Sequence, residues 1–273
     1  MSRPRWEANL DVLCRGLDGY ATANRFGTTG PPSATAARLS KSLYLAHSTA
    51  DAKFADVCGN GRLFSSQRIA AERKKPLSTR CAGVLLGTAD FVFFFAAPFR
   101  FPHTGCGLLF AASLESAHTD DGVAAPFDSG GLLKHLTWPN PAEPVLEFLL
   151  RHELPIPQHR RYLNMCMDVL FGRPEDYVEG TDPSLPGPIG LTGGDQRRWT
   201  HEVRIPEQVA LRGSHLQAVF APRARVAAEP KIERLFQWCA SERVDWVVFD
   251  TPRRDDFEAL WRMCLDYIRR TLY

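Results

Sequence analysis

The sequence predicts an α+β protein, and three features of the chain support that prediction. The run DFVFFFAA at 90–97 is almost continuously apolar, which is typical of a strand buried on both faces. The segment RRWTHEVRI at 197–205 alternates its side chains as a strand does. Segments 144–154 and 159–172 instead carry Leu, Phe and Met at helical spacing. Because these elements follow one another without a regular βαβ rhythm, the pattern favours α+β over a doubly wound sheet.

The remaining elements are expected from shorter signals. They are a helix at 6–17, a Gly/Pro/Ser-rich loop at 19–40, a strand at 43–47, a helix at 48–58, a basic helical segment at 67–77, strands at 82–87 and 106–114, a loop at 173–196, strands at 215–222 and 245–250, and helices at 229–242 and 256–272. We expect one catalytic domain over 1–273, entered through a helix and a flexible loop within 1–40. The closing helix should pack across the sheet.

Composition narrows the class of protein. The 33 basic and 31 acidic residues give a net charge of +2, which argues against a general electrostatic grip on DNA or a membrane and leaves a local basic patch open. Seven scattered cysteines without a CxxC pair predict reduced thiols. No signal peptide is evident, and no apolar run approaches the ~20 residues that span a membrane. We therefore expect a cytoplasmic protein, or one delivered into a target cell without a signal peptide, and no membrane partner.

The stretch LYLAHSTADAKFADVCGNGRLFSS at 43–66 places His47 and two hydroxyl residues at the end of a strand. A short helix, a Gly-x-Leu turn, the aromatic strand and finally THEVRIP with Glu202 follow in order. This order resembles the ADP-ribosyltransferase fold. More closely, THEVRIPEQVAL…HLQAVFAP resembles the closing glutamate strand and the following strand of its DarT-like branch.

The resemblance implies a split antiparallel sheet with flanking helices and transfer of ADP-ribose from NAD, as substrate, to a macromolecule. It implies Glu202 as the catalytic carboxylate and His47 as the group that orients the adenosine ribose or a phosphate. The other expected NAD contacts are Ser48, Thr49, Gly61, Arg62 and Phe94. The acceptor is expected to be nucleic acid or protein, and a role as a toxin or phage-defence effector implies an antitoxin or immunity protein as a further partner.

The chemistry of NAD cleavage asks for these residue types. The bond from ribose to nicotinamide breaks through an oxocarbenium-like state, as in glycoside cleavage. The leaving group is already cationic, so the site needs one anion near the sugar, and Glu202 offers it. A glycine such as Gly61 lets backbone approach a ligand, Arg62 suits a pyrophosphate, and an aromatic ring suits stacking.

Structural roles explain the same residues in other ways. A strand-end histidine such as His47 often makes a structural hydrogen bond, Glu202 also fits a surface carboxylate, and the aromatic strand fits a plain core. Two other functions stay open from the sequence: an NAD glycohydrolase, and a non-enzymatic nucleotide-binding protein on the same fold.

Three further motifs lie outside this constellation. In PFDSGGLLKH, Asp128 is expected to cap a turn, because no G-x-S-x-G elbow of a hydrolase is present. Glu115 and His118 form a single Glu-x-x-His element, so we assign no metal. Arg197 and Arg198 would border the acceptor side of the site if they lie beside Glu202.

Overall fold

The computed structural model describes residues 3–23, 31–49, 51–80, 82–97, 105–140, 142–171, 173–180, 189–192, 196–212, 214–228, 230–251 and 258–272. The strands are β1 (Leu45–Thr49), β2 (Arg62–Phe64), β3 (Phe91–Ala96), β4 (Cys106–Phe110), β5 (Val123–Ala125), β6 (Leu154–Pro155), β7 (Glu202–Pro206), β8 (Gln208–Ala210), β9 (Leu216–Pro222) and β10 (Asp245–Phe249). The helices are α1 (Arg3–Ala23), α2 (Ala34–Ser42), α3 (Asp51–Asn60), α4 (Ser66–Glu72), α5 (Ala82–Leu85), α6 (Ser113–Ser116), α7 (Ser129–Leu132), α8 (Val145–His152), α9 (Ile156–Leu170), α10 (Pro174–Val178), α11 (Arg223–Ala228), α12 (Pro230–Glu242) and α13 (Ala259–Leu272), with a 3-10 turn at Gln196–Trp199.

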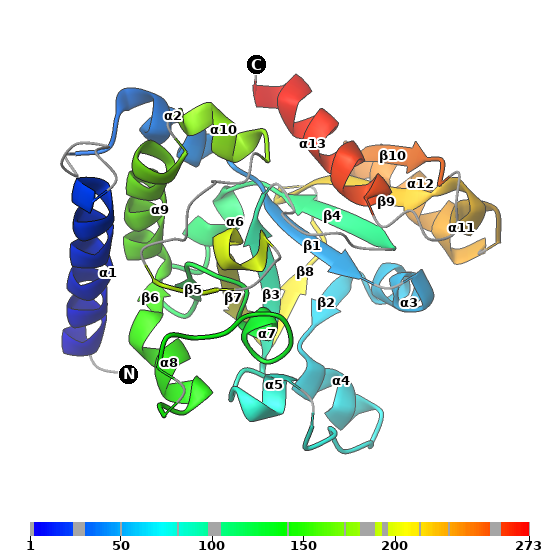
Figure 1. The fold of residues 1–273 in the computed structure, drawn as a ribbon. Coiled ribbons are helices and arrows are strands. Elements are labelled where there is room, and N and C mark those ends of the chain that lie inside the picture. The colour runs from blue at the N-terminus through cyan, green and yellow to red at the C-terminus, as the bar shows by residue number, and fades with distance from the viewer. Residues whose placement is uncertain are drawn as a thin grey trace.

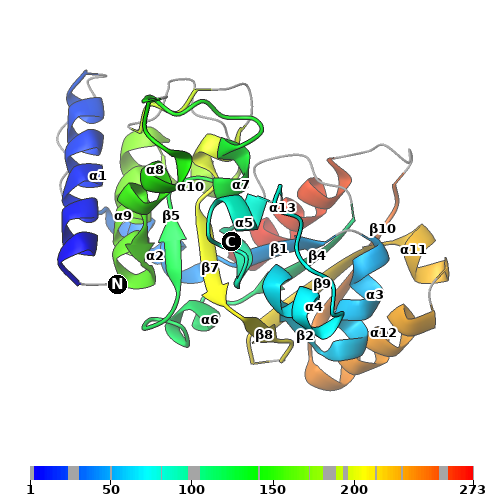
Figure 2. The same ribbon diagram turned by 90° about the horizontal axis from the view of Figure 1, so that it is seen from below.

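An eight-stranded sheet organises the fold, in the order β10-β9-β4-β1-β3-β7-β5-β6. Neighbouring strands are antiparallel, except that β9 and β10 run parallel. A second, two-stranded ladder joins β2 to β8. Figures 1 and 2 show α1, α2, α9 and α10 gathered at one end of the sheet and α3, α11 and α12 at the other. The expected α+β class, with a largely antiparallel sheet and flanking helices, is confirmed.

The sheet splits between β1 and β3. Along β1, all five residues pair with β4, from Leu45 opposite Phe110 to Thr49 opposite Cys106. On its other side β1 pairs with β3 at Leu45 and Ala46. The two strands therefore part at His47, which is where the candidate site lies.

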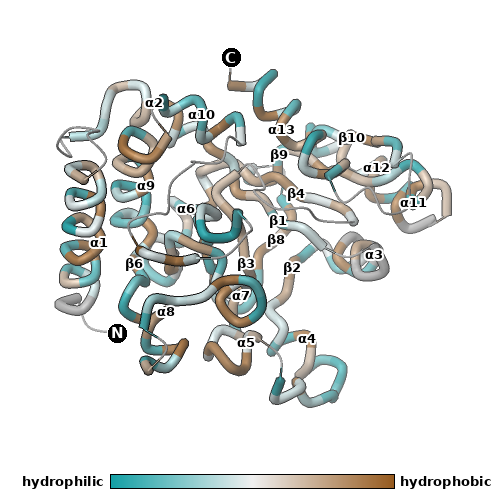
Figure 3. The backbone as a smooth tube through the Cα atoms, viewed as in Figure 1, coloured by the Kyte–Doolittle hydropathy of each residue, from teal (hydrophilic) through white to brown (hydrophobic). Residues whose placement is uncertain are grey.

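Two large clusters of buried apolar side chains cover the sheet. One includes Leu17, Leu39 and Leu163, from α1, α2 and α9. The other includes Phe54 of α3 and Ile232 of α12. Figure 3 shows hydrophobic residues concentrated on the central strands and hydrophilic stretches on α1 and after α4. Both layers bury apolar surface against the sheet, which is the main source of the fold's stability.

The closing helix packs on the sheet as the sequence predicts. Gly107 of β4 makes this possible, because a Cβ at that position would lie 2.9 Å from the Cδ1 atom of Leu260 in α13. The glycine thus lets α13 approach the strand closely. The expectation of one catalytic domain over the whole chain stays a prediction.

Several predicted boundaries are wrong. The 82–87 segment, expected as a strand, forms the short helix α5 and a turn. The strand expected from Arg197 begins only at Glu202, after the 3-10 turn. A short apolar run such as 82–87 fits a buried helix or a strand equally well, and tertiary packing decides between them.

The loop expected over 19–40 is also shorter than predicted. Helix α1 continues to Ala23, and α2 begins at Ala34, while residues 24–30 lie outside the described part of the chain. Ser33 caps α2 by accepting a hydrogen bond from the Ala36 N–H at 3.1 Å, and its own N–H donates to the Asp168 carboxylate at 2.7 Å. A capped start of this kind stabilises a short helix that composition alone does not reveal.

The long loop predicted at 173–196 is likewise interrupted, by α10, while residues 181–188 and 193–195 lie outside the described part. No helix in the described ranges combines the length and apolarity needed to cross a membrane.

Candidate functional site

His47 marks the point where β1 and β3 separate. Its Nδ1 atom lies 2.8 Å from the carbonyl oxygen of Phe93. Because a carbonyl only accepts, Nδ1 carries the hydrogen of this bond, and Nε2 of the neutral ring is an acceptor. The half-buried imidazole thus donates a hydrogen bond to a β3 carbonyl that faces β1, just beyond the last residue pair that joins the two strands.

A cavity of about 330 Å³ opens between the diverging strands. Its lining includes His47, Ser48 and Thr49 from β1, Arg62 to Phe64 from β2, Phe91 to Phe93 from β3, and residues of α3 and α4. Four of the residues predicted to contact NAD therefore share one cavity: His47, Ser48, Thr49 and Arg62.

Arg62 supplies positive charge at this cavity. Its side chain is exposed, and its Nη1 atom donates to the Oε1 atom of Gln208 on β8 at 3.0 Å. Since Gln208 is neutral, that contact orients the guanidinium without compensating its charge. A second arginine of the lining, Arg73, is instead paired with Asp56 at 2.9 Å. Arg62 is thus the better placed of the two to meet an anionic ligand.

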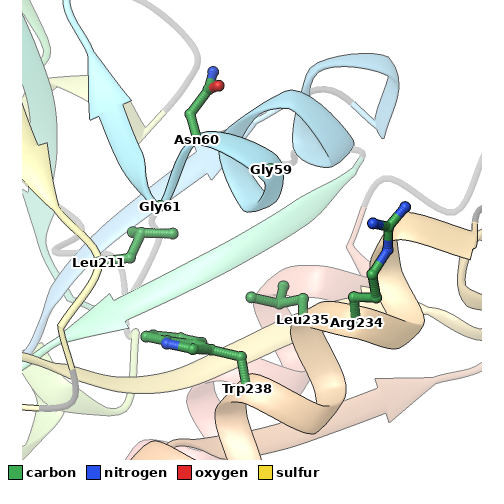
Figure 4. Close-up of a pocket in the computed structure, with 7 residues that line it drawn as sticks. All are labelled: Gly59, Asn60, Gly61, Leu211, Arg234, Leu235 and Trp238. Carbon is green, nitrogen blue, oxygen red and sulfur yellow. The ribbon is translucent and has the colours of Figure 1, made fainter.

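Gly61 lies at the border of a second cavity, of about 460 Å³. The lining is formed by Gly59, Asn60, Gly61, Leu211, Arg234, Leu235 and Trp238. Figure 4 shows Leu211, Leu235 and Trp238 below the end of α3, with the side chain of Asn60 pointing away from them. Gly61 has φ +61°, a conformation that favours glycine. Asn60 lines both cavities, so the two adjoin at this turn.

Phe94 is not one of the described residues that line the first cavity. It is 0% exposed, its ring meets Phe110 edge-on at 5.4 Å, and it lies 5.7 Å from the His47 ring. Phe91, Val92 and Phe93 of the same strand line the cavity, whereas Phe94 packs beside the imidazole in the core. The expected stacking surface therefore falls to the neighbours of Phe94.

Glu202 opens β7 and is 1% exposed, which excludes the surface carboxylate that the alternating pattern also allowed. Its carboxylate accepts from the Ser129 N–H at 3.1 Å and from the Ser129 hydroxyl, which lies 2.8 Å from Oε1 and 3.0 Å from Oε2. In the sheet Glu202 pairs with Phe95, which in turn pairs with Ala46. Glu202 is not among the described residues of either cavity, so the described geometry does not bring it into one cleft with His47.

A buried charge cluster surrounds Glu202. Arg204, 0% exposed, has its Nε atom 3.2 Å from Glu202 Oε1 and also forms an ion pair with Glu153. Burial raises the pKa of Glu202 to about 8, Arg204 opposes that rise, the negative charge of Asp128 adds to it, and the hydrogen bonds from Ser129 oppose it. Glu202 and Glu153 thus share one guanidinium inside the protein, and burial of Glu202 favours its protonated form.

The turn predicted around Asp128 is confirmed. The Asp128 side chain accepts from the N–H groups of Gly130 and Gly131, capping α7. Arg197 lies 3.4 Å from the Asp128 carboxylate and so reaches the turn that holds Glu202. The Arg198 guanidinium instead stacks over the Trp199 ring at 5.2 Å.

Sequence reasoning missed the partners of Glu202. Ser129 lies in the turn that follows Asp128, far from Glu202 in the sequence, and Arg204 lies two residues after Glu202, on the same face of the strand, a spacing that permits contact. Elsewhere Glu115 pairs with Arg160. Within the described ranges, no group of three or more His, Cys, Asp or Glu side chains could hold a metal ion.

No protein-family model and no curated protein matches the chain. Among solved structures, it is similar to Thermus sp. 2.9 DarT in complex with ADP-ribosylated ssDNA, at 11% identity and TM-score 0.42 over 76% of this chain and 93% of that one. The same protein in complex with carba-NAD+ gives 12% identity and TM-score 0.41, over 78% and 97%. Its complex with NAD+ gives 11% and 0.40, over 76% and 94%. The chain thus bears a distant resemblance to DarT, as its motifs indicate.

Proposed function

We propose that this chain is an NAD-dependent ADP-ribosyltransferase that modifies a macromolecule. The observation that supports this most is the split between β1 and β3, where His47, two hydroxyl residues and Arg62 line one cavity. Hydroxyl, imidazole and guanidinium groups are the donors and acceptors that riboses and a pyrophosphate require.

Each lining residue has a proposed role. Arg62 holds the pyrophosphate, and His47, Ser48 and Thr49 bind ribose hydroxyls. Phe91 and Phe93 offer apolar surface to an aromatic ring. The second cavity, beyond Asn60, gives further room for the same ligand, and Gly61 allows its close approach over the turn.

Glu202 supplies the anion of the proposed reaction. A carboxylate beside the ribose stabilises the oxocarbenium-like state as the nicotinamide bond breaks. Positive charge on the bound substrate favours the ionised form of Glu202, which opposes the pKa elevation caused by burial. Because Glu202 is 1% exposed, contact with NAD requires the packing around one of its oxygens to open.

Nicotinamide release tests this proposal. The purified protein is incubated with NAD alone, with single-stranded DNA, and with a cell lysate. Release only with DNA or lysate, together with labelling of the acceptor, supports the transferase. Release from NAD alone indicates a glycohydrolase. Binding of NAD without release under any of these conditions would overturn the enzymatic proposal.

Two variants test the residue roles. Glu202→Gln is expected to lower release by about 100-fold or more, with the exposed Glu147→Gln on α8 as the matched control. His47→Ala should raise the KM for NAD about tenfold with little change in kcat. If Glu202→Gln keeps full activity, Glu202 is not the catalytic carboxylate.

The proposal extends to a toxin or defence effector that acts in the cytoplasm. Expression of the wild-type chain inside a bacterial cell should then arrest growth, whereas expression of Glu202→Gln at the same level should not.

A further inference from the structure

We infer that Ser129 is a positioning residue that holds the carboxylate of Glu202 in place for the reaction, an inference that rests on the proposed function. Nothing in the sequence pattern of the 126–135 turn indicates a link to Glu202, which lies 73 positions away.

The contact is two-fold and fully enclosed. The Ser129 N–H donates to Oε2 at 3.1 Å, and the Ser129 hydroxyl lies within hydrogen-bond distance of both carboxylate oxygens. Ser129 is 0% exposed and Glu202 is 1% exposed. Water has little access to replace these bonds, so each one matters more than it would at the surface.

The turn around Ser129 is braced on several sides. Asp128 caps the N–H groups of Gly130 and Gly131, and its own N–H donates to the carbonyl of Arg197 at 3.0 Å. A Cβ at Gly131 would lie 2.9 Å from the Arg197 Cδ atom, so the glycine allows Arg197 to pack against the turn. The backbone N–H of Ser129 is therefore aimed at Glu202 by the shape of the turn itself.

The hydroxyl of Ser129 serves either protonation state of Glu202. It donates to a carboxylate and accepts from a carboxylic acid, whereas the backbone N–H only donates. The other charged groups around Glu202 are Arg204, which favours the ionised form, and Asp128, which disfavours it. Arg204 also pairs with Glu153. The N–H and hydroxyl of Ser129, in contrast, donate only to Glu202 in the described hydrogen-bond network.

Ser129→Ala removes the hydroxyl and leaves the backbone N–H. The matched control is Ser65→Ala, because Ser65 is 2% exposed and its hydroxyl caps α4 by accepting from the Arg68 N–H at 3.1 Å. Both variants delete one buried hydroxyl at the start of a short helix, but only the Ser129 hydroxyl contacts Glu202. The assay is nicotinamide release with the acceptor that supports it, measured from pH 5.5 to pH 9.

We expect Ser129→Ala to lower kcat at pH 7 by about 10- to 100-fold, with the KM for NAD within about twofold of wild type. The acidic limb of the pH profile should move about one unit to higher pH, since the ionised carboxylate loses a donor. Ser65→Ala should leave the profile in place. The inference is overturned if the two variants share the wild-type profile.

A second measurement separates this inference from the proposed function. Urea unfolding from pH 5 to pH 8 compares wild type with Glu202→Gln, and Ser129→Ala with the double variant. At pH 8, Glu202→Gln removes an ionised, buried carboxylate and should raise the unfolding free energy. This gain should be larger in the Ser129→Ala background, because there the carboxylate lacks the hydroxyl donor. Equal gains in the two backgrounds refute the role of Ser129, even if the wild-type protein cleaves no NAD and the proposed function fails.

Discussion

Arg204→Met tests the buried charge cluster most directly. Arg204 is 0% exposed and faces the carboxylates of Glu202 and Glu153, which are 1% and 4% exposed. Methionine retains much of the apolar stem but leaves both carboxylates without their cation. Removing one partner of a buried ion pair costs about 3–5 kcal/mol of unfolding free energy, because an uncompensated charge is left inside.

The size of the loss should depend on pH, and the direction follows from Glu202. Its pKa in the folded protein, about 8, lies above its ordinary value of 4.5. The stability linked to its proton is therefore fully present below pH 4.5 and is lost as pH rises through 8. Arg204 lowers that pKa, so the variant loses more as the carboxylate ionises. The penalty of Arg204→Met should be largest at pH 8 and should shrink toward pH 5.

Urea unfolding of wild type and Arg204→Met at pH 5 and pH 8 measures this difference. The control is Arg68→Met, since Arg68 forms a surface ion pair with Glu72 in which both side chains are nearly half exposed, at 48% and 45%. Such pairs contribute about 0–1 kcal/mol, so the control should change little. A penalty for Arg204→Met that is the same at both pH values, or as small as that of Arg68→Met, would refute the reasoning.

Two other predictions concern stability. The Nε2 atom of His159 lies 2.9 Å from Nδ1 of His201, and burial lowers the pKa of His159 well below 6.5. Because the unfolded chain takes up that proton below pH 6.5, stability should fall by up to about 1.4 kcal/mol per pH unit, and His159→Gln should reduce the slope between pH 6.5 and pH 5 in urea unfolding. An unchanged slope would contradict this. The Asn9 amide donates to the carbonyls of Leu150 at 3.0 Å and Glu153 at 2.7 Å, so Asn9→Ala should lower the unfolding free energy by about 1–3 kcal/mol; a variant as stable as wild type would show that α1 docks without these bonds.

The sequence predicted best the longer elements, in which the apolar pattern extends over many residues. The aromatic strand at 90–97 and the helices at 144–154 and 159–172 appear close to their expected places. Short elements failed for a physical reason. A segment such as 82–87 presents too few residues to distinguish the periods of helix and strand, so its neighbours in space decide its structure.

The candidate site also has one part that the sequence predicted and one part that it did not. His47, Ser48, Thr49 and Arg62 lie within one short stretch of chain, and a strand, a short helix and a turn are enough to bring them together. The surroundings of Glu202 come from distant segments, because Ser129 is 73 positions away and Glu153 joins through Arg204, 51 positions from it. A contact between residues so far apart in the sequence leaves no periodic pattern in either segment. Glu202 could therefore be proposed from the sequence, but its partners could not.

The two parts of the proposed site also differ in exposure, and this has a consequence for their roles. The cavity at the split is lined by half-buried His47 and exposed Arg62, groups that a ligand can reach without rearrangement. Glu202 is enclosed by Ser129 and Arg204, whose contacts oppose the rise in its pKa that burial causes. Changes at the split should therefore act on the affinity for NAD, and changes around Glu202 on the rate of bond cleavage and its pH dependence. A variant at His47 that moves the pH profile, or one at Ser129 that moves only KM, would show that binding and cleavage are not separated in this way.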